Sequence, residues 1–221
     1  MKAASKIVLL AIFSMLAAAC DNVEMKEGQD NLIVCVDLGL PSGVKWATCN
    51  VGATKPTDFG DYYAWGETEP KKMYTMGTYV WYNETDKYNT GYSVTIQPID
   101  DVAHLLWKAN WRIPTEKDWT ELKNECTWNW ILNDTTYGFS VIGPNGSSIF
   151  LPAAGSMDDY GLSRDDNHGN YWSSTIDTDY NYPNMAKCLS FFASTMSQGY
   201  YVEWYPRNPR YHGFTIRPVF D

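Results

Sequence analysis

The chain is 221 residues long, about the length of one domain, and 44% of its residues are hydrophobic, which excludes a chain that is disordered throughout. Its formal net charge is −9, and this excess of negative charge argues against binding to nucleic acid phosphates or to anionic membrane surfaces. Aromatic residues make up 15% of the chain and charged residues 19%, a balance that favours a tyrosine-rich β-type surface over a charged helical bundle.

The first twenty residues have the features of an export signal. Two lysines precede the apolar run IVLLAIFSMLAAA, which is too short to span a bilayer. The run ends directly before Cys20 in LAAAC, which resembles the lipobox of bacterial lipoproteins; a plain secretory signal is the alternative. We therefore expect a lipoprotein signal over residues 1–19, lipidation at Cys20, a flexible tether over residues 20–31 and one domain over residues 32–221. The chain would then be an extracytoplasmic outer-membrane lipoprotein that touches the membrane only through its lipid.

The first part of the domain is predicted to be β-rich and then loop-rich. LIVCVDLGLPSGVKWATCNVG, residues 32–52, contains two short β-prone runs separated by the turn signal LPSG. Residues 53–90 are dominated by Gly, Pro, Asp and Tyr, and we expect long ordered loops there.

Two helices are predicted in the middle of the chain. The stretch IDDVAHLLWKA, residues 99–109, has Asp100 available as N-cap and places four apolar residues on one face: Val102, Leu105, Leu106 and Ala109. The stretch PTEKDWTELKNEC, residues 114–126, has Thr115 and Asp118 in an approximate capping box. Its core-facing stripe is Trp119, Leu122 and Cys126.

Strands are predicted on the C-terminal side of these helices. Residues 137–155 contain two β-prone runs around GPNG and predict a hairpin. Three further strand candidates are AKCLSFFAS, GYYVEWYP and GFTIRPVF, over residues 186–194, 199–206 and 213–220. The order of strands, loops, two helices and strands predicts an α+β fold.

The cysteine pattern gives no metal or redox motif, because no two cysteines are spaced as C-x-x-C. Cys35 and Cys188 lie inside apolar runs and are expected to be buried thiols. Cys49 and Cys126 each end an apolar segment, and a disulfide between them is a hypothesis.

No catalytic residue or cofactor is predicted. The three histidines are scattered and lack metal-ligand spacing, and motifs for a zinc protease, a serine hydrolase or a phosphate loop are absent from the sequence. Paired carboxylates at residues 100–101, 158–159 and 165–166 have the chemistry to bind calcium, but they also serve as caps and turns, so we predict no metal site.

Several longer words of the sequence resemble the Fibrobacter succinogenes major paralogous domain, a family abundant in surface and secreted proteins of Bacteroidetes. The words, spread between Val36 and Val219, are VDLGLPSGVKWATCNVGA, FGDYYAWGET, WRIPTEKDWTEL, CTW, SIFLPAAGS, YWSST and GFTIRPV. The resemblance implies a C-type-lectin-like fold, two helices on a small mixed or antiparallel sheet with long ordered loops. It also implies that Trp172 is buried, that Ser173 and Ser174 satisfy nearby backbone groups, and that residues 217–219 lock the last strand.

The resemblance gives little information about activity. Formylglycine-generating enzymes, which share the fold, bind copper through two cysteines in their C-terminal half, where this chain has only Cys188. Lectin calcium motifs are approached only by QPID and WILND, whose spacing departs from them, so a calcium site is not carried over.

The segment from Gly169 to Gly213 is rich in Tyr, Ser, Asn and Gly, the residues that antibody loops use for contact. We therefore predict a non-catalytic recognition protein that binds a carbohydrate or protein ligand through C-terminal loops. The predicted contact residues are Tyr180, Asn181, Tyr182, Tyr200, Tyr201, Trp204, Tyr205, Asn208, Tyr211 and His212. The alternatives are a subunit of a surface appendage, an enzyme derived from the formylglycine-generating fold, and a target of a diversity-generating retroelement. The oligomeric state is left open.

Overall fold

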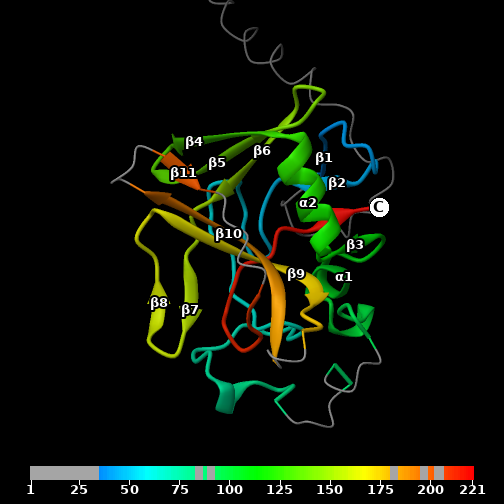
Figure 1. The fold of residues 1–221 in the computed structure, drawn as a ribbon, viewed down its shortest axis with the longest axis vertical. Helices are drawn as coiled ribbons and strands as arrows, with labels where there is room; N and C mark the ends of the chain where they lie inside the picture. Colours follow the sequence, from blue (N-terminus) through cyan, green and yellow to red (C-terminus); the bar gives the residue numbers. More distant parts are fainter. Residues whose placement is uncertain (1–34, 83–86, 89–92, 180–183, 195–198, 202–206) are drawn as a thin grey trace, which may run out of the picture.

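The computed structural model describes residues 35–82, 87–88, 93–179, 184–194, 199–201 and 207–221. These residues form a mixed α+β fold, as predicted, with two short α-helices and several small antiparallel sheets (Figure 1). The helical elements are η1 (Met76–Thr78), η2 (Pro98–Asp100), α1 (Val102–Trp107) and α2 (Glu116–Glu125).

The strands of the described residues form four small sheets. The first has the order β1 (Cys35–Asp37), β2 (Lys45–Ala47), β13 (Val219–Phe220) and β3 (Trp111–Arg112). In the second, β10 (Met185–Ser194) pairs with β9 (His168–Ile176), β11 (Gly199–Tyr201) and β12 (Asn208–Pro209). The third has the order β4 (Thr127–Asn133), β5 (Thr136–Ile142) and β6 (Ser148–Pro152). The fourth is the hairpin of β7 (Ser156–Asp158) and β8 (Gly161–Ser163).

Several strand predictions are confirmed. The runs around LPSG form β1 and β2, the stretch around GPNG forms the hairpin of β5 and β6, and the run AKCLSFFAS lies within β10. The last predicted strand is shorter than expected. Only Val219 and Phe220 form β13, whereas Phe214 and Thr215 make isolated bridges to Tyr63 and Tyr171.

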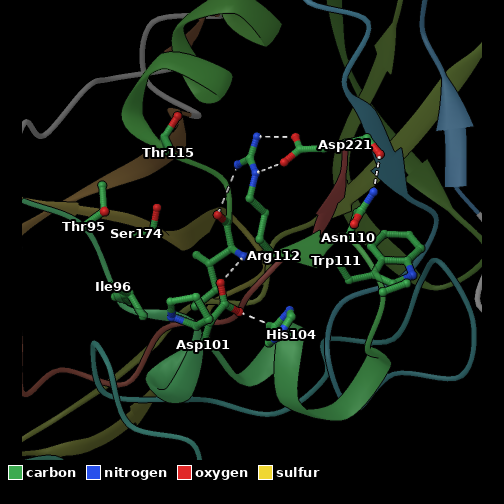
Figure 2. A pocket seen from close by; sticks show the side chains of 13 residues that line it. Thr95, Ile96, Asp101, His104, Asn110, Trp111, Arg112, Thr115, Ser174 and Asp221 are labelled. Atoms are coloured by element: carbon green, nitrogen blue, oxygen red, sulfur yellow. Dashed lines mark hydrogen bonds and ion pairs between the residues drawn. The ribbon is translucent and has the colours of Figure 1, made fainter.

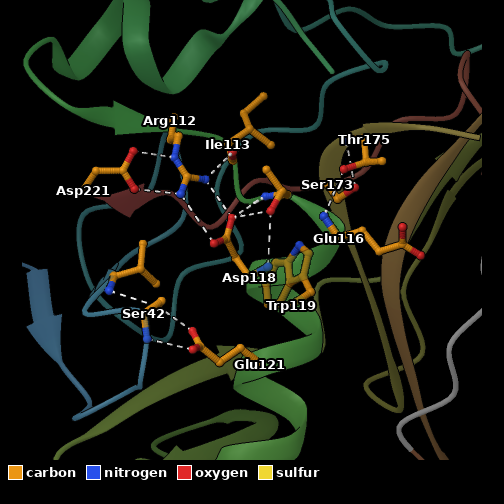
Figure 3. Close-up of polar contacts among 12 residues, drawn as sticks. Ser42, Arg112, Ile113, Glu116, Asp118, Trp119, Glu121, Ser173, Thr175 and Asp221 are labelled. Carbon is orange, nitrogen blue, oxygen red and sulfur yellow. Dashed lines mark hydrogen bonds and ion pairs between the residues drawn. The ribbon is translucent and has the colours of Figure 1, made fainter. Parts of the chain in front are cut away.

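Helix α2 begins as the sequence predicts. The Thr115 hydroxyl accepts a hydrogen bond from the Asp118 backbone N–H (3.2 Å), and the Asp118 carboxylate accepts one from the Thr115 N–H (2.6 Å), which completes the capping box (Figure 3). Trp119 and Leu122 are buried and Cys126 packs beside them, which confirms the predicted stripe.

Helix α1 differs from the prediction at its start and on its buried face. Its N-cap is Asp101 and not Asp100, because the Asp101 carboxylate accepts the His104 backbone N–H (3.0 Å) and also the Ile113 N–H (2.9 Å). The buried residues of the helix are Val102 and Ala103, whereas the predicted core residue Leu106 is 58% exposed. The second hydrogen bond comes from beyond the helix, so local sequence could not indicate it.

The core of the described residues lies in two main clusters of aromatic and aliphatic side chains. In one, the rings of Trp46 and Trp119 lie 4.6 Å apart between the first sheet and α2. In the other, Trp172 is buried and stacks on Phe214 with ring centroids 4.3 Å apart, and its indole donates to the Tyr63 carbonyl (2.8 Å). The prediction of a buried Trp172 is therefore confirmed.

Two further structural roles predicted from the family words can be compared with the structure. The Ser173 hydroxyl accepts the Thr175 backbone N–H (3.0 Å), as expected. Among the described residues, the Ser174 hydroxyl has no such backbone partner, and the residue lies instead in the wall of a cavity.

Arg217 locks the C-terminal strand to the rest of the molecule, as predicted. Its side chain is fully buried, and its guanidinium donates to Asn50 Oδ1 (2.8 Å) and to the carbonyls of Ala47 (3.0 Å), Thr48 (2.8 Å) and Phe150 (2.9 Å). Burial lowers the pKa of this guanidinium, and the carbonyl oxygens supply the hydrogen bonds that water would otherwise provide.

Candidate functional site

Most of the predicted contact residues lie in or beside segments outside the described residues. Tyr180, Asn181, Tyr182, Trp204 and Tyr205 fall outside, and Tyr200 and Tyr201 are described only as part of the backbone of β11. The structure does place the residues at which the chain enters and leaves residues 180–183 and 202–206.

The beginning of one of these segments is bonded to the end of the other. Arg207, directly after residues 202–206, donates from Nη1 to Asp179 Oδ2 (2.9 Å), and Asp179 directly precedes residues 180–183. Arg207 Nε lies 3.0 Å from Asp177 Oδ2, and Lys187 Nζ lies 3.7 Å from the same oxygen. The Asp177 side chain is only 3% exposed, so this carboxylate is bound between two cations in a protected position.

A second connection lies on the other side of residues 180–183. The backbone N–H of Arg210 donates to the Asn184 carbonyl (2.9 Å), and Arg210 Nη2 donates to Asn184 Oδ1 (2.8 Å). The Arg210 side chain is fully buried, with its guanidinium 5.6 Å from the ring centroids of both Trp65 and Tyr79. The residues on both sides of 180–183 are therefore bonded to residues that follow 202–206.

Asn208 lies next to Arg207, in β12. Its side-chain amide donates to the Cys188 sulfur (3.1 Å), and its backbone pairs with Ala186 where β12 meets β10. Asn208 was predicted from the sequence to contact a ligand, and in the structure its side-chain amide contacts Cys188 of the same chain.

Tyr211 and His212 lie beside the β7–β8 hairpin. Met157 and Gly213 exchange two backbone hydrogen bonds of 2.8 Å each, which brings the hairpin against the C-terminal segment. Tyr211 packs near the buried cluster of Ala64, Tyr74 and Tyr79, and its ring meets that of His212 edge-on at 4.9 Å.

Gly213 is the residue that allows this approach. A Cβ at this position would lie 2.7 Å from carbons of the Tyr74 ring and 2.9 Å from Cβ of Met157, closer than carbon atoms approach in proteins. The short stretch HGF therefore contains a glycine because two other segments pack directly on its backbone.

The hairpin adds three residues that sequence reasoning did not include in the site. Asp158 and Asp159 are close enough to act electrostatically on both Tyr211 and His212, and Tyr160 at the turn is 98% exposed. Burial, with the two carboxylates, raises the pKa of Tyr211. Burial lowers the pKa of His212 although the carboxylates oppose it, so the imidazole is neutral at pH 7. The only signal in the sequence was the carboxylate pair followed by tyrosine in DDYG.

We call these five residues, Asp158, Asp159, Tyr160, Tyr211 and His212, the recognition face. The face supplies an exposed aromatic ring, two carboxylates, a phenol and a neutral imidazole. These groups suit ring stacking and hydrogen bonding to a polar ligand.

A cavity of about 450 Å³ lies elsewhere, between α1, β3 and the start of α2 (Figure 2). Its charged groups hold structural elements together. Arg112 lies between two carboxylates, with Nη1 2.7 Å from Asp118 Oδ2 and Nη2 2.7 Å from Asp221 Oδ1 (Figure 3). Burial opposes the charge of Asp118, but hydrogen bonds from Arg112 and Thr115 hold the pKa of that carboxyl below its usual value. Burial raises the pKa of Asp101, which binds the α1 and Ile113 amides.

The predicted disulfide between Cys49 and Cys126 is wrong, because both residues are free thiols. Cys126 ends α2 and packs on the core beneath it, where burial raises the pKa of its thiol to about 11. Cys49 lies after β2, with its sulfur 3.6 Å from the Thr48 hydroxyl. Cys188 is a buried thiol, as predicted, and burial raises its pKa to about 11. Cys35 is buried but disulfide-bonded, contrary to the prediction of a thiol.

Within the described residues, no helix has the length and apolar character needed to cross a membrane, and no group of three or more His, Cys, Asp or Glu residues is arranged to hold a metal ion. Comparison with protein-family models, with curated proteins and with solved structures found no match to this chain.

Proposed function

We propose that this chain is a non-catalytic recognition protein of C-type-lectin-like fold that binds a ligand through the recognition face together with residues 180–183 and 202–206. The observation that carries the proposal is that the residues on both sides of 180–183 are bonded to the residues that follow 202–206. Arg207 binds both Asp177 and Asp179, and Arg210 binds Asn184. Ligand contacts made by residues 180–183 would then start from side chains that are already held in place.

A carbohydrate is the ligand class that the face favours. Sugars present apolar faces that stack on aromatic rings and hydroxyl groups that bond to carboxylates and amides. Tyr160 is almost completely exposed, and Asp158 and Asp159 adjoin it in the chain. A protein ligand is the other possibility that the tyrosine-rich composition supports.

The lectin-like assignment is supported by the placement of the family words. The tryptophans of KWATC, AWGET, KDWTEL and YWSST, namely Trp46, Trp65, Trp119 and Trp172, are all fully buried. These words therefore build the frame, and the recognition face comes from the chain between and beside them.

We further propose that Cys20 carries the lipid that anchors the domain outside the cytoplasm; the disulfide of Cys35 is then absent from the lipidated protein, because Cys49, Cys126 and Cys188 are free thiols and a thioether sulfur forms no disulfide. Mass spectrometry of the mature N-terminus from a bacterial host checks this directly, since a diacylated cysteine as first residue is expected. A mature chain that begins with an unmodified Cys20, or that begins at a later residue, would contradict the proposal.

The binding proposal is tested with residues 22–221, which contain every residue that the structure describes. The protein is screened on a glycan array beside Tyr211→Ala and a matched control, Tyr137→Ala, which removes a tyrosine that is 41% exposed on β5. We expect wild type and Tyr137→Ala to bind the same glycans and Tyr211→Ala to lose about two- to tenfold in affinity, the effect of losing one aromatic contact.

Each outcome of the screen has a meaning. If wild type binds no glycan, the carbohydrate assignment is wrong, and a protein ligand is then sought with the same three variants. If Tyr211→Ala binds as well as wild type, the site assignment is wrong even where the function is correct.

A further inference from the structure

The cavity between α1, β3 and the start of α2 has the size of a ligand site (Figure 2). Its volume of about 450 Å³ lies within the range of small-molecule sites, roughly 300–1,000 Å³. Pro98, Ala109 and Asn110 line the cavity and are exposed, so it opens to solvent. In Figure 1, α1 and β3 lie on the side of the molecule away from the β7–β8 hairpin. The cavity is therefore separate from the recognition face, and the two share no residue.

Two hydroxyl groups in the wall of this cavity are available to a ligand. Ser174 is only 5% exposed and lines the cavity, and no group of the described residues bonds to its hydroxyl (Figure 2). Thr95 lies beside it in the same wall, and its hydroxyl likewise has no bond to a described group. A buried hydroxyl without a hydrogen bond costs free energy, so Ser174 is suited to bond to a molecule that enters the cavity.

Backbone hydrogen bonds fix the positions of both hydroxyl groups. The Ile96 N–H donates to the Ser174 carbonyl (2.8 Å), and the Ser174 N–H donates to the Pro114 carbonyl (2.7 Å). Thr95 forms an antiparallel bridge with Thr175. The wall is therefore built from three segments that are far apart in the sequence, and a ligand would not have to order them on binding.

The charged groups of the cavity are already bound within the chain. All five N–H donors of Arg112 are engaged: Nε and Nη2 bond to Asp221 (2.8 and 2.7 Å), Nη1 bonds to Asp118 (2.7 Å), and two weaker bonds of 3.4 Å reach Asp118 and the Ile113 carbonyl (Figure 3). The carboxylate of Asp101 accepts two backbone N–H groups. An anionic ligand would find no donor left on Arg112 and would meet the carboxylates of Asp101 and Asp221.

The remaining groups of the wall favour a neutral ligand with both polar and apolar surface. The hydroxyl groups of Ser174 and Thr95 can each donate and accept. Ile96 and Ile113 are buried and supply apolar surface beside them. We propose that the cavity binds one neutral sugar ring, with ring hydroxyls on Ser174 and Thr95 and the apolar C–H face against Ile96 and Ile113. This site does not depend on the function proposed for the recognition face.

The test is NMR of ¹⁵N-labelled residues 22–221 during titration with glucose, galactose and mannose, beside the three corresponding uronic acids. The highest concentration is about 10 mM, above a dissociation constant of about 1 mM for weak specific binding. We expect at least one neutral sugar to shift the amide signals of Ile96, Ser174 and Thr175, and its uronic acid to bind at least about tenfold more weakly. Shifts at Tyr160 and Tyr211 report on the recognition face and are scored separately, so failure of either proposal can be told from failure of the other.

Ser174→Ala separates a binding role of the hydroxyl from a structural one. The variant should bind the sugar about two- to tenfold more weakly, the effect of one hydrogen bond. Its midpoint of urea unfolding should not fall, since the hydroxyl bonds to no described group. The control Ser148→Ala, at an exposed serine on β6, should bind as wild type does.

Four results would overturn the proposal. They are unchanged signals around the cavity with all three neutral sugars, a uronic acid that binds as tightly as its neutral sugar, a Ser174→Ala variant with wild-type affinity, and a Ser174→Ala variant with a lower urea midpoint.

Discussion

Arg217→Leu tests whether the buried guanidinium holds the frame together. The substitution removes the donors of four hydrogen bonds and leaves Asn50 Oδ1 and the carbonyls of Ala47, Thr48 and Phe150 without them. An unsatisfied buried acceptor costs at least about 1 kcal/mol, so four acceptors give about 4 kcal/mol. This loss is a large part of the stability of a typical domain, about 5–15 kcal/mol.

The assay is equilibrium unfolding in urea followed by tryptophan fluorescence, for which the fully buried tryptophans are suitable reporters. Arg217→Lys should lose about half as much as Arg217→Leu, because an ammonium has three donors on one atom and cannot reach all four acceptors. The control is Arg164→Leu, which removes an exposed guanidinium lying 4.4 Å from the Phe59 ring and should cost less than about 1 kcal/mol. A loss below about 1 kcal/mol for Arg217→Leu, at an unchanged urea dependence, would refute the reasoning.

Three further predictions follow from the recognition face and the cysteines. The pKa of His212 in the folded protein lies below its ordinary value of 6.5, so the unfolded chain binds a proton at a higher pH than the folded chain does. The contribution of His212 to the free energy of unfolding is therefore complete above about pH 6.5 and decreases as the pH falls below that value. Urea unfolding at pH 7.5 and pH 5 should therefore differ less in His212→Gln than in wild type, and an equal difference would contradict this origin. Gly213→Ala should lose about 1–3 kcal/mol in the same assay, because the new methyl group would overlap the Tyr74 ring; wild-type stability would show that the ring moves aside at no cost. In folded residues 22–221 at pH 8, Cys188 should resist alkylation and Cys126 should react slowly, since burial raises both thiol pKa values to about 11; mass spectrometry of the alkylated protein measures both rates, and rapid alkylation of Cys188 would contradict this account.

How far local sequence predicts this fold depends on where the hydrogen-bond partners lie. Helix α2 was predicted correctly because its cap residues, Thr115 and Asp118, lie within one turn of each other. Helix α1 was misplaced because Asp101 is fixed partly by Ile113, and because Lys108 adopts a positive φ of 61° that ends the helix early. No sequence pattern at the start of the helix contains that information.

The two longest strands that were not predicted, β9 and β4, were missed for different reasons. Strand β9 contains Tyr171, Trp172, Ser173 and Ser174, all buried, so it shows no alternation of apolar and polar residues. Strand β4 follows α2 after a single residue, so no turn signal separates the helix from the strand. The hairpin of β5 and β6 was predicted because GPNG marks its turn plainly.

The candidate site shows the same limit at longer range. Tyr211 and His212 were identified from the composition around them, but Asp158, Asp159 and Tyr160 lie some fifty residues earlier in the chain. They reach the face through the Met157–Gly213 bridge, and residue composition cannot report such a pairing.

The ion pairs of Arg207 connect the residue that follows 202–206 to residues directly after β9. Asp177 directly follows β9, and Lys187 lies in β10. The carboxylate of Asp177 therefore links Arg207 to the sheet that contains the buried Trp172. A surface ion pair contributes little, but a carboxylate that is 3% exposed costs several kcal/mol when one of its partners is removed. Residues that flank 180–183 and 202–206 are therefore held by a buried charge, as Arg217 holds the frame. Substitutions within residues 180–183 and 202–206 should therefore leave these ion pairs in place, because Asp177, Asp179 and Arg207 lie outside both segments.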